Sequence, residues 1–195
     1  MDINQKLRND LGELLSNSYK PQKEAEENMK KKGYKYDHEL SNMETKIFVD
    51  ENNDEPIIVH RGTTRVKDWI DDAKLAVGLG KSTQRVKDAQ EINKKVEAKY
   101  KKPAHNVGHS WGGFISENAG GHGNIITYNK GAGLGDLFTK KNSKRQLDIF
   151  VKDDLVSKIA QVTQNSNKEF VKNKRSSILK PIKHLNAHST DNLFY

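Results

Sequence analysis

The sequence contains no cysteine, only four prolines and few aromatic residues, which make up 7% of its 195 positions. Without cysteine, the chain has no disulfide, no thiolate metal ligand and no thiol nucleophile. Long hydrophobic runs are missing as well, so the sequence predicts no membrane-spanning helix. We also expect no signal peptide, because no charged-then-apolar leader is present. These absences favour a soluble protein and leave its redox compartment open.

Apolar residues are sparse too, at 33% with a mean hydropathy of −0.90. They nevertheless cluster in short runs such as Ile57–Val59 and Ile125–Ile126, which is typical of a folded chain with a thin core. The length is sufficient for one domain. We therefore expect a single domain over residues 1–195, with residues 1–43 as an N-terminal helical segment packed on it.

Positive charge is concentrated in one part of the chain, whose formal net charge is +8. Between residues 140 and 183 there are 12 lysines and arginines and four acidic residues, whereas the rest is balanced. Such a segment attracts phosphate-bearing surfaces, or it serves solubility alone. Nothing beyond the charge resembles a nucleic-acid-binding module. We therefore expect peripheral contact with an anionic membrane surface and no nucleic-acid partner.

Apolar spacing predicts an α/β fold in which helices flank a mostly parallel sheet, because strands and helices alternate through the middle of the chain. A turn at residues 52–56 separates two strands and indicates a hairpin. Helices are predicted at residues 3–15, 21–33, 66–76, 82–100 and 111–118 and from residue 153 or 154. Strands are predicted at residues 45–49, 57–60, 124–128, 147–151 and 176–182. One more short strand is predicted directly before Ser110.

The run Gly108-His109-Ser110-Trp111-Gly112 is a G-x-S-x-G pattern. In α/β enzymes this pattern forms a sharp turn from a strand into a helix and lifts the serine hydroxyl above the sheet. Glycine is needed on both flanks because side chains there would collide with the neighbouring strand and helix, and the serine itself is strained. The pattern predicts that Ser110 is a nucleophile.

A serine nucleophile needs a histidine to take its proton and a carboxylate to orient that histidine. Past Ser110 the acidic candidates are Asp136, Asp148, Asp153 and Asp154, and the histidines after them are His184 and His188. Sites in parallel sheets lie beyond the carboxyl ends of the strands. This rule favours the two acids that directly follow the predicted strand 147–151.

Three motifs together resemble the class 3 lipase family of α/β-hydrolases: Arg61-Gly62-Thr63-Thr64, Asp68-Trp69-Ile70-Asp71-Asp72 and Gly108-His109-Ser110-Trp111-Gly112-Gly113. The resemblance covers roughly residues 44–160. The ending His188-Ser189-Thr190-Asp191-Asn192 is similar to that of compact members, some of them in large DNA viruses. The resemblance implies a triad of Ser110, Asp154 and His188. It also implies an oxyanion hole made by Thr63 and the backbone N–H of Trp111.

By this resemblance the protein is a serine hydrolase that cleaves carboxylic esters of lipids through an acyl-enzyme, without a cofactor or a metal. Little chain remains for a lid, which favours monomeric esters or phospholipids over triglyceride droplets. The location is left open, with a membrane surface and a virion as the two candidates, and so is the oligomeric state. The alternative is a catalytically inactive hydrolase fold that binds a membrane or nucleic acid through its basic face.

Overall fold

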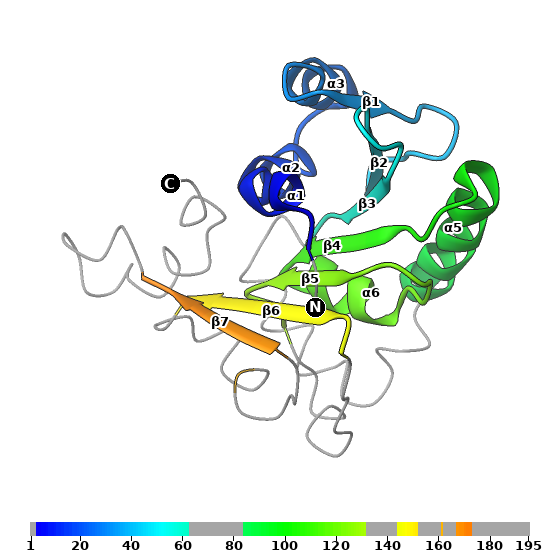
Figure 1. Ribbon diagram of the computed structural model, residues 1–195. Coiled ribbons are helices and arrows are strands. Elements are labelled where there is room, and N and C mark those ends of the chain that lie inside the picture. Colours follow the sequence, from blue (N-terminus) through cyan, green and yellow to red (C-terminus); the bar gives the residue numbers. More distant parts are fainter. Residues whose placement is uncertain (1–2, 63–83, 132–143, 152–160, 162–166, 173–195) are drawn as a thin grey trace.

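A seven-stranded mixed sheet organises the computed structural model, which describes residues 3–62, 84–131, 144–151, 161 and 167–172 (Figure 1). The strands lie side by side in sequence order. The first three pair antiparallel, and those from β3 to β7 are parallel, which confirms the predicted α/β fold. The strands are β1 (Tyr34–Tyr36), β2 (Thr45–Asp50), β3 (Pro56–His60), β4 (His105–His109), β5 (Ile125–Tyr128), β6 (Gln146–Val151) and β7 (Asn167–Val171).

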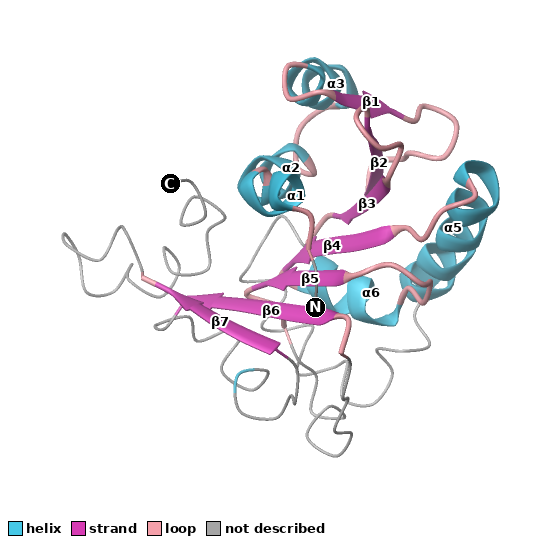
Figure 2. Ribbon diagram, viewed as in Figure 1, coloured by secondary structure: helices cyan, strands magenta, loops and turns pink. Residues whose placement is uncertain are grey.

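Helices cover both faces of this sheet (Figure 2). On one face, the leucines of the N-terminal helices pack with apolar side chains of β3 to β6 in the main core. On the other face, the longest described helix packs on β2 and β3, and the helix after β4 packs against it. The helices are α1 (Gln5–Asn9), α2 (Leu11–Asn17), α3 (Gln22–Lys30), α5 (Gln84–Tyr100) and α6 (Trp111–Asn118).

The predicted single helix over residues 3–15 is wrong in one respect, because the chain breaks into α1 and α2 at Asp10. This residue has φ −93° and ψ 3°, outside helical geometry, and its N–H ends α1 by bonding the carbonyl of Lys6. Its carboxylate accepts a hydrogen bond from the buried Tyr34 hydroxyl at 3.1 Å. The bend therefore lets both short helices direct their leucines at the sheet while Asp10 anchors β1.

Two strands were missed by apolar spacing, and both are edges of the sheet. β1 is only three residues long, and β7 is exposed or half-buried along its length with charged residues Lys168 and Glu169. Short or polar edge strands lack the apolar alternation that predicts a strand. By contrast, the hairpin of β2 and β3 is confirmed. The predicted helices at 66–76 and from 153 or 154, and the predicted strand 176–182, lie outside the described residues.

The central strand β4 is unusually polar for a buried parallel strand, and its polar side chains are paired with neighbours. His60 Nε2 donates to Asn106 Oδ1 at 3.1 Å, and the Thr45 hydroxyl donates to His60 Nδ1 at 3.2 Å, an assignment that follows from the acceptor role of the Asn106 oxygen. In the neutral imidazole of His60, Nε2–H therefore has a hydrogen-bond acceptor and Nδ1 has a hydrogen-bond donor. Burial lowers the pKa of His60 to about 4.

We expect His60 to make the protein less stable as the pH falls from about 6.5 to 4. In this window the unfolded chain binds a proton at His60 that the folded chain does not, so the free energy of unfolding falls by on the order of 3 kcal/mol. Urea unfolding at pH 7, 6 and 5 measures this slope. The matched variant His60→Gln should show a shallower slope, and an identical slope in both proteins would contradict the assignment.

Candidate active site

Ser110 occupies the turn between β4 and α6, where the strand-to-helix pattern placed it. Its backbone has φ 58° and ψ −124°, a conformation that residues with a side chain rarely adopt. The residue is 4% exposed. A strained backbone of this kind persists only where the surrounding structure holds it, and it is often found at functional sites.

Two glycines allow the close packing that holds the turn. A Cβ atom on Gly108 would lie 2.1 Å from the carbonyl oxygen of Gly112, and a Cβ atom on Gly112 would lie 2.1 Å from the carbonyl oxygen of His60. Real side chains do not approach backbone atoms so closely. The first turn of α6 therefore rests directly on β3 and β4 only because both positions are glycine, as the sequence pattern predicts.

The ends of three adjacent parallel strands surround Ser110. Its N–H donates to the carbonyl of Tyr128 at 3.0 Å, and its own carbonyl accepts from Gly131 N–H at 3.3 Å, both at the end of β5. After β3, the chain turns at Gly62, where a Cβ atom would lie 3.2 Å from Ser110 Cβ. The serine thus lies at the carboxyl edge of the sheet, where α/β proteins place their active sites.

Tyr19, between α2 and α3, joins the N-terminal helices to this edge. Its oxygen accepts from Gly62 N–H at 3.1 Å, and its hydroxyl lies 2.8 Å from His109 Nδ1. Burial, partly offset by the Gly62 hydrogen bond, raises the pKa of Tyr19 to about 12, so the phenol is neutral and donates to His109. No local sequence signal identifies Tyr19, because its partners lie more than 40 residues away along the chain.

One of the two predicted oxyanion donors is described. Trp111 is the first residue of α6, and backbone N–H groups in the first turn of a helix have no intrahelical acceptor. Its indole ring stacks on Phe114, with ring centroids 4.7 Å apart and an angle of 13° between the planes. The other predicted donor, Thr63, lies outside the described residues.

The predicted acid and base also lie outside the described residues. This applies to Asp154 and His188 and to their alternatives Asp153 and His184, so the acid and base roles remain predictions. A further acidic candidate, Asp148, is described and is engaged elsewhere: its carboxylate pairs with Lys130 at 3.0 Å.

Lys130 forms the centre of a buried polar cluster beneath α6. Its side chain is 0% exposed and lies 3.0 Å from the Asp148 carboxylate and 3.4 Å from that of Glu117. Asp148 also accepts hydrogen bonds from the side chains of Thr127, at 2.6 Å, and Gln146, at 2.9 Å. The cluster connects β5, β6 and α6, so it fixes the helix that directly follows Ser110.

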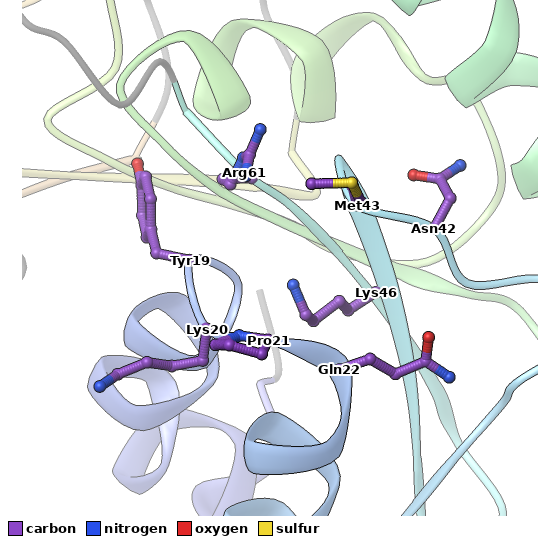
Figure 3. Close-up of a pocket in the computed structure, with 8 residues that line it drawn as sticks. All are labelled: Tyr19, Lys20, Pro21, Gln22, Asn42, Met43, Lys46 and Arg61. Carbon is purple, nitrogen blue, oxygen red and sulfur yellow. The ribbon is translucent and has the colours of Figure 1, made fainter.

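A pocket of about 500 Å³ opens beside the active site (Figure 3). The close-up shows Arg61 and Met43 on one side, Lys20, Pro21 and Gln22 on the other, and Lys46 reaching from β2 towards the Tyr19–Pro21 segment. Tyr19 also lines it, and its hydroxyl bonds both Gly62 and His109. The pocket is therefore connected to the turn that carries Ser110 through the hydrogen bond between Tyr19 and His109.

In the described part of the chain, no three histidine and acidic side chains are grouped closely enough to bind a metal ion. None of the helices in this described part has the length and apolar character needed to cross a membrane.

One comparison with known proteins identifies a family. A family model for a Tle-like phospholipase domain, described as phospholipase-like, matches residues 12–155. The match begins inside α2 and spans the rest of that helix, α3, the hairpin, the Ser110 turn and the sheet through β6. No curated protein matches the chain.

Proposed function

We propose that this chain, which belongs to the family of Tle-like phospholipase domains, hydrolyses the carboxylic esters of phospholipids with Ser110 as its nucleophile. The family supports a lipid hydrolase in general. The observation that carries the serine mechanism is the strained backbone of Ser110, held at the carboxyl edge of a parallel sheet by two obligatory glycines. A structural turn residue would need neither the strain nor the close packing.

In the proposed reaction, the Ser110 oxygen attacks the ester carbonyl while His188 takes its proton and passes it to the leaving alcohol. Asp154 orients His188, and the N–H of Trp111 together with Thr63 stabilises the oxyanion. Water then attacks the acyl-enzyme, with His188 again accepting a proton, and releases the fatty acid. The likeness of the motifs to class 3 lipases supports these assignments, and the basic segment 140–183 would hold the enzyme on an anionic membrane.

A fluorophosphonate probe tests the nucleophile directly. We expect the native protein to be labelled on Ser110 and to release fatty acid from phosphatidylglycerol micelles, because both reactions need an activated serine. Mass spectrometry of the labelled peptide and a fatty-acid assay measure the two results. Native protein that takes no label and releases no fatty acid would instead favour the inactive binding module.

The same probe distinguishes the two candidate bases. We expect His188→Ala to abolish labelling and His184→Ala, a matched removal of a histidine four residues away, to leave it unchanged. The reverse result would identify His184 as the general base. Labelling that survives in both variants would show that neither histidine is the base.

A further inference from the structure

The pocket beside Ser110 contains two cations that no described carboxylate neutralises. Lys46 is 3% exposed, and its ammonium group donates to the carbonyl of Ser18 at 2.7 Å, a neutral partner. Arg61 has its Nε atom buried with no hydrogen-bond partner. By contrast, Lys20 at the rim pairs with Glu24 at 3.0 Å. The two inner cations are therefore left with unused donors.

Keeping the buried charge of Lys46 without a described carboxylate partner is unfavourable for folding. A buried charge without a partner destabilises a protein by several kcal/mol, so buried lysines and arginines are normally paired. Burial, reinforced by the positive charge of Arg61, lowers the pKa of Lys46 to about 8. Features that lower the stability of a protein without improving its packing are concentrated at functional sites. An anionic ligand would supply the missing charge.

The chemistry of the pocket favours phosphate as this ligand. An ammonium has three N–H donors and Lys46 uses one of them within the protein, while a guanidinium presents a fork of donors that suits phosphate oxygens. The remaining walls include Tyr19, Pro21 and Met43, and Met43 is 77% exposed at the surface. A polar floor beside an exposed apolar side chain suits an amphiphile.

The place of the pocket ties the phosphate to the ester that reacts. Arg61 directly precedes Gly62, where an added Cβ atom would lie 3.2 Å from Ser110 Cβ, and Tyr19 connects the pocket wall to both Gly62 and His109. In a glycerophospholipid, a few bonds of one glycerol unit separate the phosphate from the ester carbonyls. A phosphate held by Arg61 would therefore present an ester of the same molecule to Ser110.

We propose that Lys46 and Arg61 bind the headgroup phosphate of a glycerophospholipid and thereby make the enzyme prefer phospholipids to uncharged lipid esters. This assignment rests on the proposed hydrolase function and names the residues that recognise its substrate class. Both residues act on substrate binding and leave the chemistry at Ser110 to other groups.

The test compares two substrates with the same acyl chains, phosphatidylglycerol and diacylglycerol, in micelles of one neutral detergent. The readout is the ratio of their kcat/KM values. We expect wild type to favour the phospholipid, and Lys46→Met to lower the ratio by about tenfold or more because methionine keeps the apolar stem and loses the charge. Arg61→Gln should lower the ratio in the same direction.

Lys94→Met is the matched control, because Lys94 is exposed on α5, across the sheet from the pocket, and its replacement should leave the ratio unchanged. Thermal unfolding separates recognition from folding: Lys46→Met should unfold at or above the wild-type midpoint, since it removes a buried unpaired charge. An unchanged ratio in both pocket variants, with normal unfolding, would overturn the headgroup assignment.

Two further outcomes are distinguishable. Wild type that hydrolyses neither lipid would refute the hydrolase function itself.

To separate a lipid headgroup from free phosphate, diacylglycerol hydrolysis is measured with added inorganic phosphate or glycerophosphoglycerol, the deacylated headgroup. We expect stronger inhibition by the deacylated headgroup, and this difference should shrink in Lys46→Met. Inhibition by inorganic phosphate alone would assign the pocket to that ion and overturn the lipid proposal.

Discussion

Replacing Ser110 with alanine is expected to reduce kcat for ester hydrolysis by about 10⁴-fold or more, since the acyl-enzyme can no longer form. Replacing it with glycine should remove activity to the same extent and also stabilise the fold. Glycine adopts φ 58° without the steric penalty of a Cβ atom, so Ser110→Gly should exceed Ser110→Ala in free energy of unfolding by about 1 kcal/mol. Steady-state kinetics and urea unfolding provide the two measurements.

This pair of variants separates chemistry from backbone strain. Activity in either variant above about one hundredth of the wild-type value would show that Ser110 is not the nucleophile. Equal stability of the two variants would show that the turn relaxes in solution and that the strain is not maintained by the packing of Gly108 and Gly112.

Replacing Lys130 with methionine is expected to lower the free energy of unfolding by about 3–5 kcal/mol, because it leaves carboxylates buried without their cation. Adding Asp148→Asn should recover part of this loss, since the uncompensated charge is then removed. Chemical unfolding of both variants measures the effect. Activity should fall with the loss of folded protein, because the cluster positions α6 behind Ser110.

An exposed ion pair provides the control for Lys130. Lys95 and Glu91 lie 2.6 Å apart on α5, with side chains 57% and 65% exposed, so Lys95→Met should change stability by less than about 1 kcal/mol. A loss at Lys130 no greater than that at Lys95 would mean that water reaches the cluster beneath α6.

Several elements could be predicted because their signals are local. The hairpin of β2 and β3 is marked by two apolar runs and a polar turn, and α5 by apolar residues at helical spacing. The break at Asp10 could not be predicted from apolar spacing, because the side chain that contacts Asp10, Tyr34, lies 24 residues further along the chain. Apolar spacing describes which face of an element is buried and not which partner interrupts it.

The candidate site also contains features that local sequence predicts and features that it does not. The turn at Ser110 was foreseeable, because the glycines that permit it lie within two residues on either side. Asp148 could not be assigned in this way. From the sequence it is a candidate for the acid of the triad, and only the pairing of β5 with β6 shows that it lies beside Thr127 and Lys130. The acid and base roles of Asp154 and His188 remain predictions from motif resemblance.

Short-range sequence patterns were sufficient to predict the fold class and the strained serine turn, because periodicity and glycine spacing act over a few residues. The contacts between residues far apart in the chain are visible only in the folded structure. Tyr19 reaches His109 across 90 positions, and Lys46 joins Arg61 beside the serine because β2 and β3 pair in one register. Such contacts depend on how strands align and helices pack, and no short stretch of sequence contains that information.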